Sequence, residues 1–290
     1  MVNYVNLLLM YKPVVMSNED YHAHKNYSST NIRAHLDCDE KGVASSIPSD
    51  KPSSKAFIEG SAVHAYLGEP EIFKRDFICK PLDLSLRTKE GKQWLIDNDD
   101  KIVLDFDFYN NLPLIANSFY KTPAKDIYTK DGLIERSFFW TDVFGVDCKC
   151  RPDWISPDYR IIIDLKTTID ANPRKFKQSI VKYRYDIQAQ FYRRGIEYCT
   201  GVKPEAFYFI AIEKTAPFCV GVYRITEDWL AIGDKEIDEA LYRIDSMIQR
   251  GHTIGYTPEI MDLSPPQWML DREDKAKSMS GIPLNEIALF

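Results

Sequence analysis

Residues 160–168, RIIIDLKTT, constrain the fold of this 290-residue chain more than any other segment. Three consecutive isoleucines are typical of a central strand, because β-branched side chains favour the extended conformation. The segment then becomes polar, and Asp164 and Lys166 are two residues apart, so their side chains project to the same face. The chain is therefore predicted to contain a central strand with charged groups at one end.

The pattern of apolar residues predicts an α/β fold with a mixed central sheet flanked by helices. In 143–155 the apolar Val146, Cys148, Cys150 and Trp154 alternate with Asp147, Lys149, Arg151 and Asp153, which indicates one half-buried strand. Further strands are expected over 133–140, 160–168, 205–213 and 218–225, the last two joined as a hairpin. Helices are expected over 28–35, 56–67, 86–100 and 108–120, from Asn172 to about Cys199, and from Thr226 to Arg250.

Residues 41–55, rich in Ser and Pro, are predicted to be a loop, and the last forty residues are expected to wrap the surface. We expect one domain over 1–290, with a C-terminal helix and extended tail over 226–290.

Composition excludes several classes of protein. With 44% hydrophobic and 28% charged residues, the chain is not predominantly disordered. No apolar run approaches the ~18 residues of a membrane helix, and the N-terminus lacks the basic flank and cleavage site of a signal peptide. The six cysteines are scattered without a CxxC, so we expect buried thiols in a reduced, cytoplasmic protein.

The charge is unevenly distributed. The chain as a whole carries −6, which does not favour general coating of nucleic acid, but residues 171–194 carry +6 and leave −12 for the remainder. The basic residues of this block are Arg174, Lys175, Lys177, Lys182, Arg184, Arg193 and Arg194, with tyrosines between them. We predict a surface that follows phosphates, with Arg174, Lys175, Lys177 and Lys182 lining a DNA channel.

Asp153, Asp164 and Lys166 are the candidate catalytic residues. A five-residue turn can place Asp153 beside Asp164 on adjacent strands, where two carboxylates repel unless a cation lies between them. Oxygen ligands favour Mg²⁺ or Mn²⁺, and the Lys166 ammonium can orient an attacking water, which suits phosphodiester hydrolysis. The alternative is a surface ion pair, because D-x-K is a common tripeptide.

The motifs and their order resemble those of a known superfamily. Arg151-Pro152-Asp153 and, ten residues later, Asp164-Leu165-Lys166-Thr167-Thr168 resemble the PD-(D/E)xK nuclease core. Gln188 and Tyr192 form a Q-x-x-x-Y, and residues 60–64 form a G-x-x-x-H, both similar to motifs of the RecB-type branch. The order of the four motifs is most similar to the RecE-type (exonuclease VIII) group, over about residues 28–225.

This resemblance implies a restriction-endonuclease-like core and a role for each matched residue. His64, Asp153 and Asp164 would bind the metal together with the Leu165 carbonyl, and Lys166 would orient water or stabilise the transition state. Gln188 and Tyr192 would support the site or contact the DNA backbone. Glu135 lies where relatives often carry an acid, although a charged residue at a strand edge is an equal alternative.

Without the motif, His64 would be interpreted as a core histidine. His22 and His24 belong to no such motif and are expected to be solvated. The isolated Cys199 and Cys219 argue against the iron–sulfur cluster of Cas4-like relatives.

The resemblance also implies an activity and partners. We expect a Mg²⁺-dependent exodeoxyribonuclease, with Mn²⁺ able to substitute, that degrades double-stranded DNA from an end in the 5′→3′ direction. It would leave 3′ single strands for a RecT-like annealing protein in phage recombination within the host cytoplasm, and would form a ring-shaped homo-oligomer. The alternatives are a Cas4-like or structure-specific nuclease of other polarity, and a non-catalytic DNA-binding module on a nuclease core.

Overall fold

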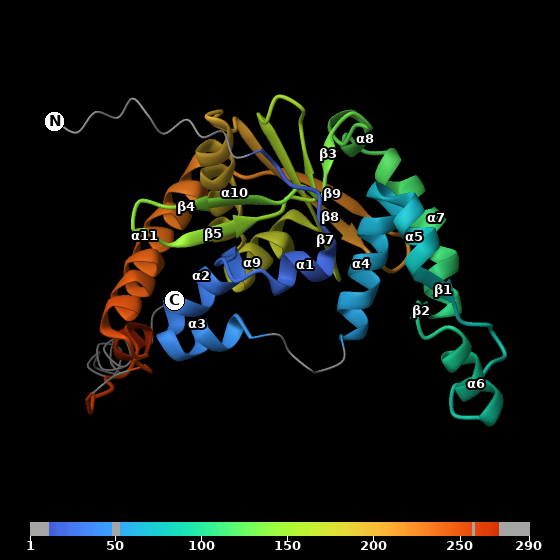
Figure 1. Ribbon diagram of the computed structural model, residues 1–290, viewed down its shortest axis with the longest axis horizontal. Coiled ribbons are helices and arrows are strands. Elements are labelled where there is room, and N and C mark those ends of the chain that lie inside the picture. The colour runs from blue at the N-terminus through green and yellow to red at the C-terminus, as the bar shows by residue number, and fades with distance from the viewer. Residues whose placement is uncertain (1–11, 48–52, 257–258, 273–290) are drawn as a thin grey trace, which may run out of the picture. The chain divides into compact units, whose positions relative to one another are not determined.

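The computed structural model describes residues 12–47, 53–256 and 259–272 (Figure 1). Its contacts divide the chain into a unit that ends at Thr253 and a short one that begins at Ile254. In the second unit, residues 267–272 are helical. The predicted extent of one domain over 1–290, with a tail that wraps the surface, stays a prediction. Everything below concerns the first unit.

The strands of the first unit are β1 Phe77–Cys79, β2 Ile102–Leu104, β3 Leu133–Ile134, β4 Phe138–Thr141, β5 Asp147–Cys150, β6 Trp154–Ile155, β7 Ile161–Thr168, β8 Ala206–Glu213 and β9 Val220–Arg224. The helices are α1 Asn18–Ala23, α2 Ser29–Asp37, α3 Asp39–Ser45, α4 Lys55–Gly68, α5 Pro70–Asp76, α6 Lys89–Asp97, α7 Phe106–Tyr120, α8 Ala124–Ile127, α9 Pro173–Tyr183, α10 Tyr185–Thr200 and α11 Glu227–Arg250.

The largest sheet has five strands in the order β3-β6-β7-β8-β9, with β7 in the middle. β7 and β8 are parallel over eight residue pairs, whereas the other neighbours in this sheet are antiparallel. A parallel neighbour requires a crossover, and α9 and α10 supply it. The predicted mixed central sheet and the central position of 160–168 are therefore confirmed.

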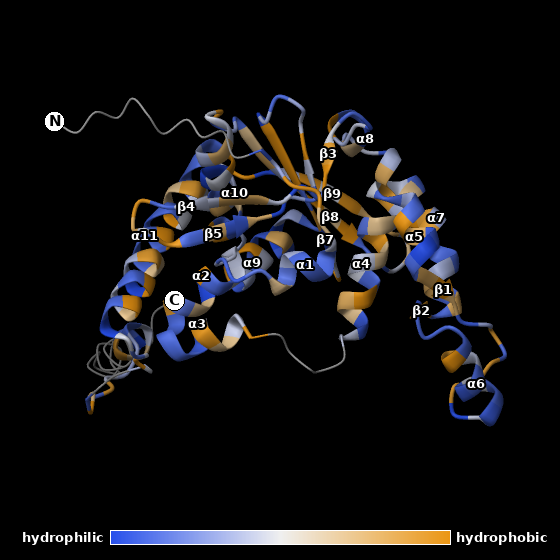
Figure 2. Ribbon diagram, in the orientation of Figure 1, coloured by the Kyte–Doolittle hydropathy of each residue, from blue (hydrophilic) through white to orange (hydrophobic). Residues whose placement is uncertain are grey.

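Helices cover both faces of this sheet. Along β8, Phe207, Phe209 and Ala211 belong to one apolar cluster with residues of α2, α9, α10 and α11, whereas Ile210 and Ile212 belong to a second cluster with residues of α4 and α7. This alternation is the period of two that a strand buried on both faces requires. In Figure 2 the strands of this sheet are largely orange, whereas the surrounding helices carry blue residues.

Two of the predicted strands are each interrupted in the middle. Segment 133–140 breaks at Glu135, whose φ is +50°, and segment 143–155 breaks between Cys150 and Trp154. Pro152 lies in the second break and has no N–H with which to continue a ladder. The halves pair separately, β4 with β5 and β3 with β6. The prediction of continuous strands was wrong because it counted alternation across both breaks.

The interruptions also change which side chains are buried. Trp154 packs in the cluster opposite the one that holds Cys148 and Cys150, so these residues do not share a face. Lys149, predicted to be solvated, is only 5% exposed, and its ammonium donates to the carbonyls of Tyr21 and His24 at 2.7 and 2.6 Å. The partners of Lys149 lie more than 120 residues away along the chain, so local alternation could not reveal them.

The helix expected from Asn172 to Cys199 is two helices. Arg184, with φ +53°, ends α9 and begins α10. The other predicted helices are present, and α3 together with the start of α4 shortens the predicted loop over 41–55. Residues 48–52 of that loop lie outside the described residues. Phe57, an apolar residue in the first turn of α4, is exposed.

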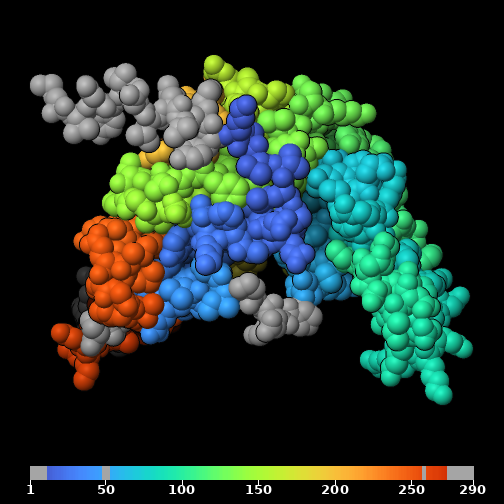
Figure 3. All heavy atoms as spheres, in the orientation of Figure 1, coloured from blue at the N-terminus to red at the C-terminus, as the bar shows by residue number. Residues whose placement is uncertain are grey.

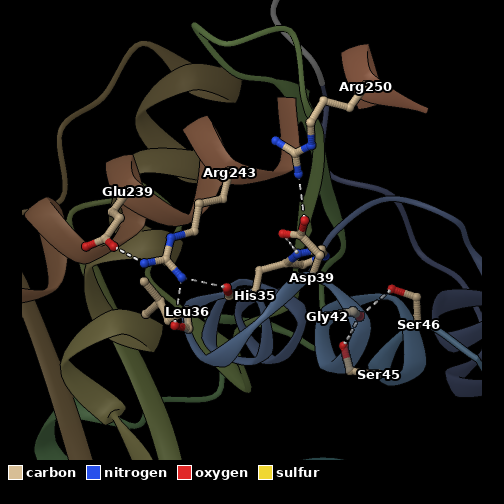
Figure 4. Close-up of polar contacts among 9 residues, drawn as sticks. All are labelled: His35, Leu36, Asp39, Gly42, Ser45, Ser46, Glu239, Arg243 and Arg250. Atoms are coloured by element: carbon tan, nitrogen blue, oxygen red, sulfur yellow. Dashed lines mark hydrogen bonds and ion pairs between the residues drawn. The ribbon is translucent and has the colours of Figure 1, made fainter. Parts of the chain in front are cut away.

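Helices α2 and α3 are tied to α11 by arginines (Figure 4). The Arg243 guanidinium donates to the carbonyls of His35 and Leu36, at 3.5 and 3.0 Å, and Arg250 contacts the Asp39 carboxylate at 2.7 Å. These contacts hold α2 and α3 against α11. Among the described residues, no helix is both long and apolar enough to cross a bilayer.

We expect Gly233→Ala to destabilise the fold because α11 approaches α10 very closely at this glycine. A Cβ at position 233 would lie 2.6 Å from the carbonyl oxygen of Asp186, a main-chain atom that cannot easily move. Overpacking of this kind costs about 1–3 kcal/mol, which corresponds to a loss of roughly 2–10 °C in melting temperature. Thermal unfolding of Gly233→Ala beside Lys235→Ala, an exposed change on the same helix, tests this; equal melting temperatures would contradict it.

Candidate active site

The two strand interruptions lie against each other and expose charged groups beside the central strand. The N–H of Glu135 donates to the carbonyl of Asp153 at 3.2 Å, so the irregular residues of both segments are joined through the main chain. Asp153 directly precedes β6, and β6 pairs with β7, which carries Asp164. The predicted arrangement of Asp153 and Asp164 on neighbouring segments is present.

α4 brings His64 to this point. The helix packs against the end of β7, where Gly60 leaves so little room that a Cβ would lie 3.1 Å from Thr167 Oγ1. His64 Nδ1 is 3.4 Å from Asp153 Oδ1, and the other oxygen of Asp153 accepts the Leu165 N–H at 2.5 Å. His64 is thus not an apolar core histidine but faces a carboxylate. Leu165 contributes its N–H here, and the ligand role of its carbonyl stays a prediction.

Glu135 completes a group of three possible ligands. One ligand atom each from His64, Glu135 and Asp153 lies within 4.8 Å of the others. Glu135 is also paired with Arg151, whose Nε lies 2.8 Å from Glu135 Oε2. The match of Glu135 to the family pattern was loose in the sequence, and the structure places it inside the cluster because its left-handed backbone turns the chain there.

Asp164 and Lys166 lie beside this group on the buried middle strand. Lys166 Nζ is 2.5 Å from Asp164 Oδ1, and the amide of Gln188 donates to Asp164 Oδ2 at 2.6 Å. Lys166 also lies 4.7 Å from the centre of the Tyr185 ring. Tyr192 is buried one helical turn beyond Gln188 and hydrogen-bonded to it. Gln188 thus contacts the Asp164 carboxylate and Tyr192 contacts Gln188; that the pair supports the site or contacts the DNA backbone stays a prediction.

Two contributors were missed by the sequence analysis as members of the site. Arg151 had been placed on a solvent-facing strand surface, but it balances Glu135 and lies 5.4 Å from the centre of the Tyr21 ring. Tyr21 comes from α1, an N-terminal helix that was not predicted. The Arg in R-P-D was visible in the sequence, yet nothing there indicated a partner in 12–27.

The charges of the cluster shift its pKa values strongly. Burial and the charge of Asp153 raise the pKa of Glu135 to about 8, against the opposing effect of Arg151. Burial also raises the pKa of Asp164 to about 6, although Lys166 opposes it. For His64, burial lowers the pKa, but the charges of Asp153, Glu135 and Asp164 outweigh this and raise it to about 9. Glu135 and Asp164 therefore ionise less readily than usual, whereas the charge and hydrogen bond of His64 outweigh burial and lower the pKa of Asp153.

These residues fit a divalent cation. Three converging ligand atoms, one imidazole nitrogen and two carboxylate oxygens, are donors that Mg²⁺ and Mn²⁺ accept. Burial and, after it, the charge of Asp153 raise the pKa values of Glu135 and Asp164, and a cation bound beside these carboxyl groups would favour their ionised forms. His64, Glu135 and Asp153 would hold such an ion, with Asp164 next to them.

The predicted DNA-binding residues all lie on one helix surface. Arg174, Lys175, Lys177 and Lys182 are exposed on α9, which packs through Phe176 and Ile180 against the sheet.

The remaining basic residues of the 171–194 block are held by other contacts, contrary to prediction. Arg184 pairs with Asp186 and Glu236, and Arg194 with Asp234 and Asp238. Arg193 donates to the Pro204 carbonyl. These three arginines attach α10 to neighbouring elements, and acidic residues of α11 are among their partners.

A polar cavity is lined by Tyr21 and Tyr192, which also contact residues around the cluster. It has a volume of about 390 Å³, and its lining includes Tyr192 and Lys149 together with hydroxyl groups of Ser28, Ser29 and Thr30. His22 and His24, predicted to be solvated, line it as well. In Figure 3 the segment of α1 and α2, which supplies much of this lining, lies in blue on the face turned to the viewer.

We expect a divalent cation to stabilise the protein more at pH 8.5 than at pH 6. Folding raises the pKa values of Asp164, Glu135 and His64, so these groups stabilise the metal-free fold at a pH below their ordinary pKa values. This contribution is lost as the pH rises through about 6, 8 and 9, the pKa values in the folded protein. The same deprotonations free the ligand atoms for a cation.

At a Mn²⁺ concentration of about 100 Kd, the gain in melting temperature at pH 8.5 should be about 5–10 °C. Melting in Mn²⁺ and in EDTA at both pH values measures this, and Glu135→Gln should flatten the dependence. A gain that is equal at both pH values would refute the assignment.

Comparison with known proteins concerns the fold. The sequence matches no curated protein. The structure is similar to that of a candidate exonuclease from Eubacterium rectale, with 16% sequence identity, a TM-score of 0.56, and coverage of 89% of this chain and 98% of that one. An alkaline exonuclease from Laribacter hongkongensis matches at 12% identity over 66% of this chain and 96% of its own, with a TM-score of only 0.28.

The predicted restriction-endonuclease-like fold is confirmed, whereas the narrower RecE-type assignment stays a prediction. Residues 28–259 match the model of a family described as a PDDEXK-like domain of unknown function (DUF3799). Because this match spans most of the chain, the protein belongs to that PDDEXK-like family.

Proposed function

We propose that this chain is a divalent-cation-dependent deoxyribonuclease that hydrolyses double-stranded DNA from an end, with Mg²⁺ as its working ion and Mn²⁺ able to replace it. The observation that carries the proposal is the meeting of His64, Glu135 and Asp153 within 4.8 Å, beside the Asp164–Lys166 pair on the central strand. A structural ion pair would not require an imidazole and two further carboxyl groups at the same place.

Each residue has a task that follows from its position. Lys166 presents an ammonium that Asp164 holds on one side and the Tyr185 ring contacts on another, so its charge is directed and ready to orient a water or to offset charge on a phosphate. Gln188 holds the Asp164 carboxylate in place. The cation, when bound, would lower the pKa of a water and offset negative charge on the phosphate.

DNA would reach the site along α9 and the polar cavity. The exposed residues Arg174, Lys175, Lys177 and Lys182 give α9 four positive charges on the face that is not packed against the sheet. The cavity beside Tyr192 offers hydroxyl and amino donors that suit phosphate oxygens. An otherwise acidic protein can in this way hold DNA at the site and avoid coating it elsewhere.

The finer details of the proposal rest on the order of the sequence motifs. They are degradation in the 5′→3′ direction, a 3′ single-stranded product that a RecT-like annealing protein takes over, and a ring-shaped homo-oligomer. Duplexes labelled at the 5′ or the 3′ end, incubated with Mg²⁺ and sized over time, test the polarity. Early release of 5′-terminal label supports the proposal, whereas loss of the 3′ label first supports a nuclease of other polarity. Intact duplexes at all times would leave only a DNA-binding module.

Asp164→Ala and Lys166→Ala should each lower the rate of hydrolysis at least about 10²–10³-fold, since each removes a charge that acts directly at the site. Binding of duplex DNA in EDTA should remain close to that of the parent, because α9 is untouched. Lys203→Ala, which changes an exposed lysine in the α10–β8 loop, is the control. Parental rates in Asp164→Ala would refute the site assignment.

Replacing both Lys175 and Lys177 by Gln should flatten the slope of log affinity against log salt concentration by roughly one to two units, because each phosphate contact contributes about −0.9 to that slope. Turnover on saturating short duplexes should be almost unchanged, and the length of DNA digested per encounter should fall. A salt titration of binding in Ca²⁺ and a trap experiment measure these effects. The control is the double variant in which Lys203 and Lys235 are replaced by Gln. An equal slope in the parent and in the Lys175/Lys177 variant would mean that α9 does not contact DNA.

A further inference from the structure

Two tyrosines form a stack beside Lys166. The rings of Tyr183 and Tyr185 lie nearly parallel, with their centres 5.6 Å apart and an interplanar angle of 27°. Tyr185 also packs on Phe209 of the sheet, with ring centres 5.4 Å apart, and the Lys166 ammonium lies 4.7 Å from the centre of its ring. Tyr183 and Lys166 are thus both neighbours of the Tyr185 ring.

This stack exists only because the helix breaks at Arg184. In a continuous α-helix, residues two apart point about 200° away from each other around the axis, so their rings cannot meet. Arg184 adopts the left-handed conformation, φ +53°, which a residue with a Cβ rarely takes. Tyr183 ends α9 and Tyr185 begins α10, and the turn between them brings both rings to one side.

Several contacts hold the break in place. The Arg184 guanidinium donates to both oxygens of Asp186, at 3.2 and 3.0 Å, and lies 3.3 Å from Glu236 of α11. Arg33 of α2 donates to the carbonyl of Tyr183. Three helices thus maintain a strained backbone next to the candidate active site, an arrangement that is found where strain serves a function.

Tyr183 differs from the residues below it in its exposure. Phe209 is fully buried and Tyr185 is half-buried, whereas 44% of Tyr183 is open to solvent. Lys182, itself exposed, lies 5.0 Å from the centre of the Tyr183 ring. An aromatic ring that stacks on a second ring, is nearly half exposed and lies beside an exposed cation has the features of a surface on which nucleic acid bases stack.

We propose that Tyr183 is a stacking platform for a nucleobase of the strand whose phosphate enters the active site. This rests on the proposed function, and it adds the part of the substrate that the chain holds next to the cut. The Tyr185 ring sets the plane of Tyr183, and Lys182 can leave the ring to pair with a neighbouring phosphate. Because every base has a π-face, such a platform holds DNA without a strong preference for sequence.

The experiment combines abasic DNA with variants of Tyr183. Duplexes with one abasic site, placed in turn at each of the last positions of either strand, are bound in Ca²⁺ to the parent and to Tyr183→Ala. In the parent, loss of the base at one position should weaken binding about 5- to 100-fold. In Tyr183→Ala the intact duplex should bind as weakly as that abasic duplex binds to the parent, and the abasic site should cost nothing further.

Three further proteins separate stacking from packing. Tyr183→Trp should keep the dependence on the abasic position, and Tyr183→Leu, which still covers Tyr185 with an apolar side chain, should lose it. Tyr198→Ala removes another tyrosine that is 44% exposed, near the opposite end of α10, and should behave as the parent. Melting curves show that each variant is folded.

The outcomes distinguish this proposal from the proposed function. If the parent binds and cuts duplex DNA but the abasic penalty is the same in parent and Tyr183→Ala at every position, the platform is refuted and the nuclease stands. If Tyr183→Leu retains the dependence, the ring only packs against Tyr185, which also refutes the platform. If the parent neither binds nor cuts DNA in Mg²⁺, the proposed function fails and the platform fails with it.

Discussion

Main-chain hydrogen bonding between β7 and β8 determines where Asp164 and Lys166 point. The two strands are parallel and paired residue by residue from Ile161 to Thr168, with β8 as the partner throughout. A strand buried on both faces has no freedom to rotate, since a slip of one residue would exchange its charged and apolar faces. Ile163 and Leu165 therefore face the cluster that includes α4 and α7, whereas Asp164 and Lys166 contact Gln188 and Tyr185 of α10. All other parts of the candidate site are arranged around these two side chains.

Three irregularities of the backbone lie at or beside the candidate site. Glu135 and Arg184 both adopt left-handed conformations, and Pro152 interrupts the strand that leads to Asp153. Each irregularity places a polar side chain where a regular strand or helix could not, and each is held by contacts from other elements. Regular structure supplies the buried apolar area that stabilises the fold, and the breaks supply the geometry of the site.

The charges of the chain serve two separate purposes. On α10, Arg194 pairs with acids of α11, and Arg184 at its start pairs with Asp186 and Glu236, so these arginines join helices. On α9, Lys175 and Lys177 remain exposed. The same block of sequence therefore contains residues that hold the protein together and residues that are available to a polyanion.

Much of this could be predicted from local patterns. Three isoleucines followed by D-L-K-T-T indicate a buried strand with a charged end. The segments on either side of it along the chain also show the alternation of strands, which agrees with a central position in a sheet. Asp153 and Asp164 could be predicted to lie together from the turn between their strands, whereas His64 and Gln188 were placed beside them only by the resemblance to the nuclease motifs. The burial of Lys149, the pairing of Arg151 with Glu135 and Tyr21, and the left-handed residues at 135 and 184 could not, because each depends on groups contributed by distant parts of the chain. The local sequence shows the spacing of apolar residues that predicts a helix or a strand. An interruption of that helix or strand is stable only when contacts from other parts of the folded protein hold it.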